Sequence, residues 1–145
     1  MKKKITRVLA LMLAVALALS LAACGKKDSG TPEKPELPVA DGAVIGQGAT
    51  AFTVEVQGAD GKVVAFTVNT DEETLGAALL SLGVVAGDST EYGLYVKTVN
   101  GETANYDTDG VYWAVYIGDE MAMVGVDSIN VEAGATYAFR VEKAA

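Results

Sequence analysis

Apolar and polar residues alternate with a period of two in several short stretches after residue 50. Two such stretches flank a Gly-Ala-Asp-Gly turn at 58–61, and their apolar positions are Phe52, Val54, Val56, Val64, Phe66 and Val68. This alternation is typical of strands that bury one face and expose the other. We therefore predict a β-hairpin at the start of the folded part.

The apolar period changes to that of a helix between residues 71 and 82. Positions i, i+3, i+4 and i+7 are occupied by Leu75, Ala78, Leu79 and Leu82. Thr70 and Glu73 have the spacing of a capping box, and Gly83 suits a left-handed helix end. We predict one amphipathic helix over residues 71–82, with Val84 closing back on Leu79.

Two further hairpins follow the helix and a loop around 87–89. An Asn-Gly pair at 100–101 separates 93–99 from 102–106, and a Gly-Asp pair at 118–119 separates 110–117 from 120–124. Both pairs are typical of tight hairpin turns, of types I′ and II′. Strands are also expected at 127–131 and 136–141. The order predicts an α+β domain, with a β-grasp-like mixed sheet of hairpins and one helix as the preferred arrangement.

The 110–125 hairpin has two apolar faces if its register starts with Ile117 opposite Glu120. One face is expected to pack on the core and carries Trp113, Val115, Ile117, Ala122 and Val124. The other face carries Tyr112, Tyr116, Met121 and Met123. Tyr and Met side chains suit a large flat ligand or a protein partner, although a second layer of the same domain is the alternative cover. Tyr92 and Tyr95 on the neighbouring hairpin are weaker candidates.

The first 23 residues have the pattern of a secretory signal peptide. Four basic residues precede an apolar run at 8–21, which is short for a membrane span. Leu21-Ala22-Ala23-Cys24 resembles the lipobox of bacterial lipoproteins. The resemblance implies cleavage before Cys24, lipid on its sulfur, and a mature chain anchored at the extracytoplasmic face of the cell membrane.

Residues 24–49 are expected to form the lipidated Cys and a flexible linker, and residues 50–145 the folded domain. All three prolines lie in 32–38, where large apolar residues are nearly absent. Such a segment buries too little surface to offset its chain entropy. We predict an extended spacer between membrane and domain.

Charge and composition exclude several classes of function. Of the 11 Lys and Arg residues four lie in 1–23, so seven remain against 19 Asp and Glu in the processed chain, a net charge of −12. That charge disfavours nucleic acid and anionic lipid headgroups as partners. The chain has no His and a single Cys, which excludes Ser-His-Asp and Cys-His catalysis and the usual zinc sites.

No other catalytic or metal pattern is persuasive. Residues 105–110 have oxygen-bearing side chains at alternate positions, as at the start of a calcium loop, but Tyr116 stands where a bidentate Glu is needed. An Asp-rich turn is the preferred interpretation. No pair of carboxylates stands out for glycoside hydrolysis. We therefore expect a protein that is not an enzyme and has neither a cofactor nor a metal site.

Several ordered motifs resemble the bacterial transcobalamin C-terminal-like domain, over roughly residues 51–141. They are Thr67-Val68-Asn69-Thr70, residues 74–80, 91–101 and 109–117, and Gly125-Val126-Asp127-Ser128. In the vertebrate cobalamin carriers the related domain closes over a corrinoid held against a helical domain. The resemblance thus implies capture of a corrinoid such as cobalamin. Without histidine, the chain has no imidazole to offer the cobalt.

Two functions remain open from the sequence. The first is a cell-surface binding module that captures a corrinoid-like ligand for uptake, through the Tyr/Met face. The second is a structural or interaction module of the cell envelope that docks a protein or a glycan by the same face or by a free strand edge. A concave pocket beside Tyr112 and Met123 favours the first, and a flat patch or a bare edge favours the second.

Overall fold

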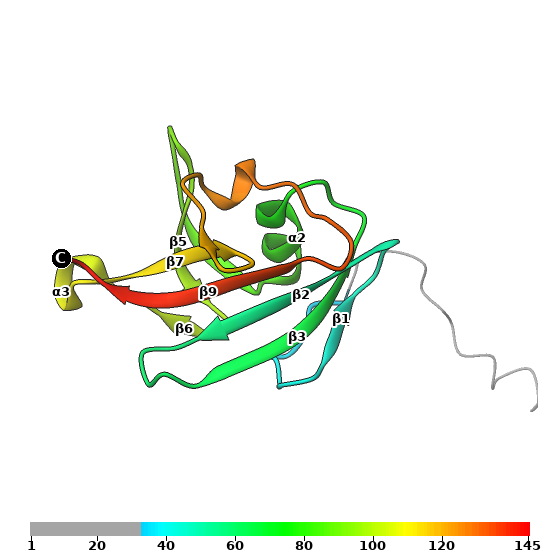
Figure 1. Cartoon of the computed structure of the whole chain (residues 1–145), viewed down its shortest axis with the longest axis horizontal. Coiled ribbons are helices and arrows are strands. Elements are labelled where there is room, and N and C mark those ends of the chain that lie inside the picture. The colour runs from blue at the N-terminus through cyan, green and yellow to red at the C-terminus, as the bar shows by residue number, and fades with distance from the viewer. Residues whose placement is uncertain (1–32) are drawn as a thin grey trace, which may run out of the picture. The chain divides into compact units, whose positions relative to one another are not determined.

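The computed structural model describes residues 33–145, which form two β-sheets around one main helix (Figure 1). The larger sheet has six strands in the order β1-β3-β2-β9-β7-β8, with bounds β1 Val44–Gly46, β3 Val63–Thr70, β2 Thr50–Gln57, β9 Thr136–Lys143, β7 Val111–Ile117 and β8 Glu120–Met121. The smaller sheet has the order β4-β5-β6, with bounds Val85–Thr90, Gly93–Val99 and Glu102–Thr103. Helices are α2 Leu75–Leu82, the short α3 Tyr106–Asp109 and the 3-10 turn η2 Val126–Ser128. The predicted α+β class is confirmed.

The first predicted hairpin is confirmed as β2 and β3, with Val54 opposite Phe66 in an antiparallel register. β9 lies on the other side of β2 and runs parallel to it, with Val56 opposite Phe139. The apolar positions of the alternating pattern all lie on the face that meets α2. Phe52, Val54 and Phe139 are almost completely buried there.

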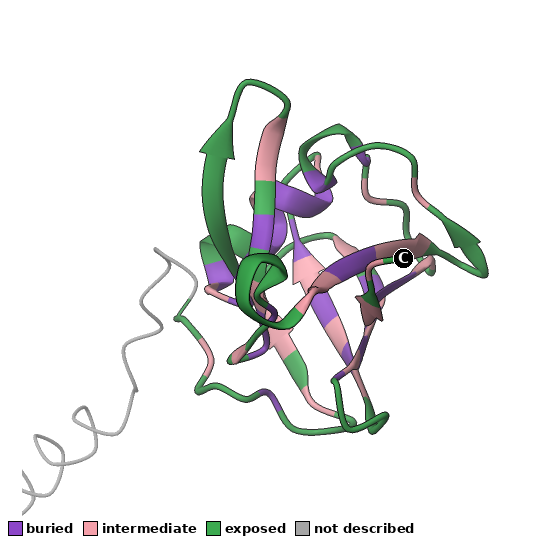
Figure 2. Ribbon diagram, turned by 90° about the vertical axis from the view of Figure 1, so that its left-hand side faces the viewer, coloured by how far each residue is buried: buried purple, intermediate pink, exposed green. Residues whose placement is uncertain are grey.

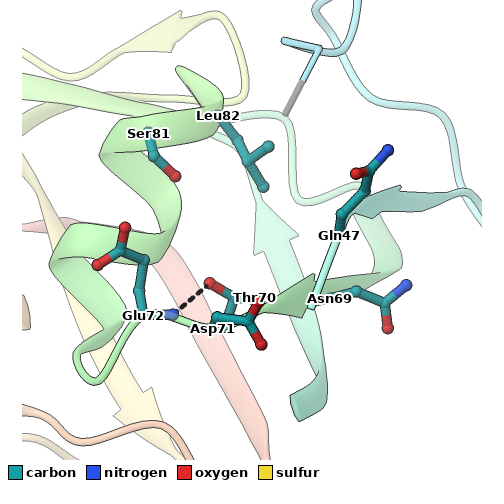
Figure 3. Close-up of a pocket in the computed structure, with 7 residues that line it drawn as sticks. All are labelled: Gln47, Asn69, Thr70, Asp71, Glu72, Ser81 and Leu82. Atoms are coloured by element: carbon teal, nitrogen blue, oxygen red, sulfur yellow. Dashed lines mark hydrogen bonds between the residues drawn. The ribbon is translucent and has the colours of Figure 1, made fainter. Parts of the chain in front are cut away.

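Helix α2 starts later than its sequence pattern predicts. Its N-cap is Thr74, whose side-chain oxygen accepts from the backbone N–H of Ala77, so the expected start at residue 71 is wrong. Thr70 instead accepts from the backbone N–H of Glu72 at 3.0 Å in a local turn (Figure 3). The Thr70–Glu73 capping box does not form, because the N-cap is Thr74. The cause is tertiary: Glu73 and Thr74 pair with the 129–131 segment, where the Val131 N–H donates to the Glu73 carbonyl at 3.0 Å.

The end of α2 agrees with its local signal. Gly83 has φ +74°, and the N–H of Val84 donates to the carbonyl of Leu79 at 3.0 Å, as expected for a Schellman motif. The helix is buried on one side only, since Leu80 on its other side is 40% exposed, and Figure 2 shows the buried residues gathered in the interior of the domain. Its apolar stripe, Leu75, Ala78, Leu79 and Leu82, is at most 2% exposed, so α2 is the centre of the core.

The predicted boundary between linker and domain at residues 49 and 50 lies too late in the chain. Val39 is 4% exposed, and both its backbone N–H and its carbonyl bond to the side chain of Asn100. β1 then pairs in parallel with β3 over Val44–Gly46. Residues 39–49 thus belong to the folded unit, because a buried Asn and a sheet edge distant in sequence hold them.

The smaller sheet contains a strand that the sequence analysis missed. The stretch predicted as a loop around 87–89 is part of β4, which pairs antiparallel with β5 and has a bulge between Ala86 and Gly87. The β5/β6 hairpin is confirmed: Asn100 has φ 49° and Gly101 φ 82°, as a type I′ turn requires. β6 is only two residues long, because the chain turns at Asn105 into α3.

The β7/β8 hairpin has the predicted register at its tip, with Tyr116 opposite Met121 and Ile117 opposite Glu120. Beyond Ala122 the predicted pairing is wrong, because residues 123–126 leave β7. Ile117 and Val124, expected in the core, are 43% and 54% exposed. The strand expected at 127–131 is also absent: η2 and an isolated bridge at Asn130 occupy this stretch.

The signal peptide at 1–23, Cys24 and the first part of the predicted linker lie outside the described residues. Within residues 33–145, no helix has the length and apolar character needed to span a membrane.

Candidate functional site

A cavity of about 210 Å³ lies between the two sheets, beside the open edge of β7. β5 forms one wall, with Leu94, Tyr95 and Val96. β7 forms the other wall from Tyr112 to Val115, and the segment 121–126 closes one side. The cavity is therefore built from three parts of the chain that are separated in sequence.

The cavity exists because β8 is short. Only Tyr116 and Ile117 of β7 pair with β8, and the last bond along this edge is from the Ala122 N–H to the Val115 carbonyl at 2.8 Å. The chain then turns toward α2, where Val126 is 1% exposed and the Asp127 carboxylate accepts from the Leu94 N–H at 2.8 Å. These anchors pull the segment away from β7 and leave a gap along the strand.

Trp113 joins the two sheets at the base of this gap. Its indole N–H donates to the carbonyl of Lys97 on β5 at 3.1 Å, and the side chain is 6% exposed. The predicted place of Trp113 in the core is confirmed, and the residue also lines the cavity. An intrinsic fluorophore therefore lies in the wall of the site.

The structure brings together three of the six predicted ligand-binding residues. Tyr112, Met121 and Tyr95 all line the cavity. Tyr112 is partly buried, whereas Tyr95 and Met121 are 43% and 44% exposed at its rim. The remaining lining is mainly aliphatic. Tyr95 alternates with the inward-facing Leu94 and Val96, and Tyr112 shares a face of β7 with Tyr116, so the two phenol groups lie at the rim of an apolar slot.

Tyr116 has a different environment. Its hydroxyl donates to the carboxylate of Glu142 at 3.0 Å, and the Arg140 guanidinium lies 4.3 Å from the centre of its ring, both on β9. The hydrogen bond to Glu142 raises the pKa of Tyr116 above its usual value. Tyr116 thus belongs to the outer face of the large sheet and does not line the cavity.

Met123 and Tyr92 are exposed outside the cavity. Met123 is 90% exposed on the segment that leaves β8, and Tyr92 is 87% exposed at the tip of the β4/β5 hairpin. Tyr92 lines a separate, open hollow along that hairpin, together with Tyr95 and Gly125. The two sites meet at Tyr95.

Nine of the twelve lining residues were not predicted as ligand-binding residues: Leu94, Val96, Trp113, Ala114, Val115, Ala122, Val124, Gly125 and Val126. The alternation of β5 indicates which of its side chains point inward, but no local pattern shows that β5 faces β7. The motif Gly125-Val126-Asp127-Ser128 is the signal nearest to finding them, because Asp127 ties this motif to Leu94.

A polar hollow of about 270 Å³ lies beside α2 (Figure 3). Its polar groups mostly serve the local backbone. Asp71 accepts from the Ala49 N–H at 2.8 Å, and the Ser81 hydroxyl donates to the Ala78 carbonyl at 2.8 Å. We assign this hollow to the junction of β1, β3 and α2.

No group of three or more Cys, Asp or Glu side chains suited to a metal ion occurs within residues 33–145. The Asp-rich stretch at 105–110 forms α3, capped by Asn105, whose side-chain oxygen accepts from the N–H groups of Asp107 and Thr108. Gly110 ends this turn with φ 64°.

Comparison with known proteins gives this fold a family. Residues 72–143 match the family described as a domain of unknown function (DUF4430). The crystal structure of a candidate metal-binding protein from Ruminococcus gnavus is 31% identical, with a TM-score of 0.64, and the match covers 67% of this chain and 100% of that one. The chain belongs to the DUF4430 family.

Haptocorrin in complex with Cbi has the same fold in part of its chain. The match has a TM-score of 0.50 and 20% identity, and covers 66% of this chain but 25% of haptocorrin. An identity of 20% shows that the two proteins share a fold and nothing more. The expected resemblance to the cobalamin carriers is therefore confirmed at the level of the fold. No curated protein matches the chain.

Proposed function

We propose that the DUF4430 domain is a non-catalytic binding module that holds one edge of a flat, largely apolar small molecule in the cavity between β5 and β7. The observation that carries the proposal is the meeting of Tyr95, Tyr112 and Met121 in one cavity. Tyrosine combines a large apolar surface with a hydroxyl, and methionine adapts to irregular ligands. A corrinoid is the preferred ligand, supported by the fold shared with haptocorrin.

The size of the cavity limits how much of a corrinoid can enter it. About 210 Å³ is less than the range of roughly 300–1,000 Å³ typical of pockets that enclose a drug-sized ligand. A corrinoid would therefore insert an edge beside Trp113 and extend over the exposed Met121 and Met123. Binding from one side is consistent with a domain that covers a ligand held by a second protein.

The test is a titration of residues 33–145 with cobinamide and cobalamin, followed by Trp113 fluorescence and calorimetry. We expect saturable binding at one site, and Tyr112→Ala to weaken it at least tenfold, or about 1.4 kcal/mol. Tyr116→Ala is the matched control, since it removes the same side chain from the same strand outside the cavity, and its affinity should stay within about twofold.

Absence of binding at about 1 mM corrinoid would overturn the corrinoid proposal for this domain. Equal losses in Tyr112→Ala and Tyr116→Ala, with both variants folded by circular dichroism, would place the ligand on the outer face of the large sheet instead.

The alternative from the sequence, docking by a free strand edge, has less support at β4, and the unpaired edge of β7 lines the proposed ligand cavity. β4 is an edge strand, but it carries a bulge at Ala86 and Gly87 and a charged Asp88. Both features protect natural sheets against pairing with another chain. The parallel pairing of β2 with β9 supports the finer, β-grasp-like description of the core.

We also propose that the domain is anchored through lipid on Cys24 at the extracytoplasmic face of the cell membrane, as the lipobox pattern implies. Two or more acyl chains are needed for stable attachment. Cys24→Ser should move the protein from the membrane fraction to the soluble fraction, and mass spectrometry of the wild-type N-terminus should show the lipid. An unmodified Cys24 would contradict the anchor.

A further inference from the structure

A second cavity lies on the outer side of the small sheet and shares one lining residue, Tyr95, with the proposed corrinoid site. Its volume is about 380 Å³, within the range of ligand pockets. β4 and β5 form its floor, and α3 with the residue before it forms one wall. Its lining includes six charged, amide or aromatic side chains: Asp88, Tyr95, Lys97, Asn105, Tyr106 and Asp107.

The hairpin places one charged pair and one aromatic ring side by side in this cavity. Asp88 on β4 lies directly opposite Tyr95 on β5, so the two side chains share a face of the sheet. Lys97, two residues further along β5, forms an ion pair with the same Asp88. The hydrogen bond with Asp88 raises the pKa of Lys97, which keeps the ammonium group charged.

The second wall comes from the turn into α3. The side-chain oxygen of Asn105 caps this turn through the N–H groups of Asp107 and Thr108, at 3.0 and 3.2 Å. That use of the oxygen leaves the Asn105 amide N–H groups as donors. Tyr106 follows directly and is 56% exposed, while Tyr95 is 43% exposed. Two phenol rings therefore line the same polar cavity.

The lining offers donors and acceptors together with flat apolar surface. The Lys97 ammonium and the Asn105 amide donate, and the carboxylates of Asp88 and Asp107 accept. A ligand rich in hydroxyl groups matches this mixture, because each hydroxyl can both donate and accept. Tyrosine rings supply the apolar surface on which the C–H face of a sugar ring packs.

We propose that this cavity binds a neutral carbohydrate, with a pyranose ring packed against Tyr106 and its hydroxyl groups bonded to Asp88, Lys97 and Asn105. Anionic ligands are disfavoured because Asp88 and Asp107 outnumber Lys97 among the six residues. A cationic ligand is disfavoured because the Asp88 carboxylate, with which it would pair, already forms an ion pair with the Lys97 ammonium. The site shares Tyr95 with the proposed corrinoid site, but Tyr106, Asp88, Lys97 and Asn105 line only the carbohydrate cavity.

The experiment titrates residues 33–145 with maltotetraose, cellotetraose and N,N′,N″,N‴-tetraacetylchitotetraose, by calorimetry and by NMR chemical shifts. We expect saturable binding of at least one probe with a Kd of about 1 mM or tighter. Tyr106→Ala should weaken that binding at least fivefold, and Tyr106→Phe should retain it, because the ring is kept.

Tyr92→Ala is the matched control, since it removes an exposed tyrosine from the same hairpin outside this cavity. Failure of all three probes at about ten times that Kd overturns the proposal. Binding that Tyr106→Ala leaves unchanged also overturns it. The two sites fail separately: Tyr112→Ala should weaken only corrinoid binding, and Tyr106→Ala should weaken only carbohydrate binding.

Discussion

Aromatic residues are buried in the core between the large sheet and α2 but exposed on the outer side of the small sheet. Where the large sheet meets α2, Phe52, Phe66 and Tyr137 are at most 2% exposed, and Phe52 packs edge-on against Tyr137 with ring centres 5.3 Å apart. On the β4/β5 hairpin and around α3, Tyr92, Tyr95 and Tyr106 are 43–87% exposed. The same class of side chain stabilises the fold in one region and is free to contact ligands in the other.

The difference follows from the single large helix. One amphipathic helix covers one face of one sheet, so α2 completes the core beside β2, β3 and β9. Nothing of comparable size covers the outer side of β4 and β5 within the described residues. Apolar side chains there stay exposed, which is the condition for a binding surface.

Loss of a core aromatic should break the buried region. Phe139 is fully buried on β9, opposite Val56 on one neighbour and Val115 on the other. Phe139→Ala should lower the free energy of unfolding by about 3–5 kcal/mol, through lost transfer energy and the cavity left behind. Urea denaturation followed by circular dichroism measures it. A loss below about 1 kcal/mol would mean that this region is not the core.

Loss of the hydrogen bonds between the Asn100 side chain and the Val39 backbone should have the next largest effect on stability. Asn100→Gly keeps the left-handed turn but leaves the buried N–H and carbonyl of Val39 without partners, so we expect a loss of about 2 kcal/mol. The control is the same substitution in a chain that begins at residue 44, which lacks Val39. An equal loss in both chains would show that the substitution acts through the turn and not through Val39.

Tyr137 should make stability depend on pH in the alkaline range. Burial raises the pKa of Tyr137 above its ordinary value near 10, so the folded state keeps the phenol proton longer than the unfolded state does. The stabilisation is complete below pH 10 and is lost as pH rises through the folded-state pKa.

Tyr137→Phe tests this dependence. Its hydroxyl accepts from the Glu132 N–H at 2.9 Å and donates to the Asn130 carbonyl at 3.0 Å, so the variant should lose about 1 kcal/mol at neutral pH. Its stability should also decline less steeply above pH 10 in denaturation curves measured at several pH values. An unchanged decline would assign the alkaline dependence to other groups, such as Tyr116.

The smallest effect is expected in the exposed region. Tyr92→Ala removes a side chain that is 87% exposed, and the free energy of unfolding should change by less than about 0.5 kcal/mol. Thermal and urea denaturation measure it beside Phe139→Ala. A loss comparable to that of the core variant would show that the β4/β5 hairpin is part of the core after all.

Short-range signals predicted the elements that depend on neighbours in sequence. The β2/β3 hairpin, the Asn100-Gly101 turn and the Gly83 helix end were all confirmed, because alternation and turn chemistry act within a few residues. The helix start was wrong because the pairing of Glu73 and Thr74 with residues 129–131 overrode the Thr70 cap. The capping box depends on residues three apart, whereas the pairing that replaces it joins residues more than fifty apart in sequence.

The candidate site shows the same division. Sequence alternation selected Tyr112 and Met121, and the structure places both in one cavity. It also selected Tyr116, whose partners Arg140 and Glu142 on β9 no local pattern reveals. Leu94 and Val126 were missed because their contribution depends on where β5 and η2 lie.

By itself, the sequence determined the two-residue turns, the alternating strands, the apolar stripe of α2 and the acidic charge, since each is a property of residues close together in the chain. The tertiary structure alone decided that β8 stops after two residues, that Asp127 holds the β5 backbone, and that a cavity opens between the sheets. These features depend on contacts across tens of residues, such as the 33 between Leu94 and Asp127, and no periodic pattern encodes them.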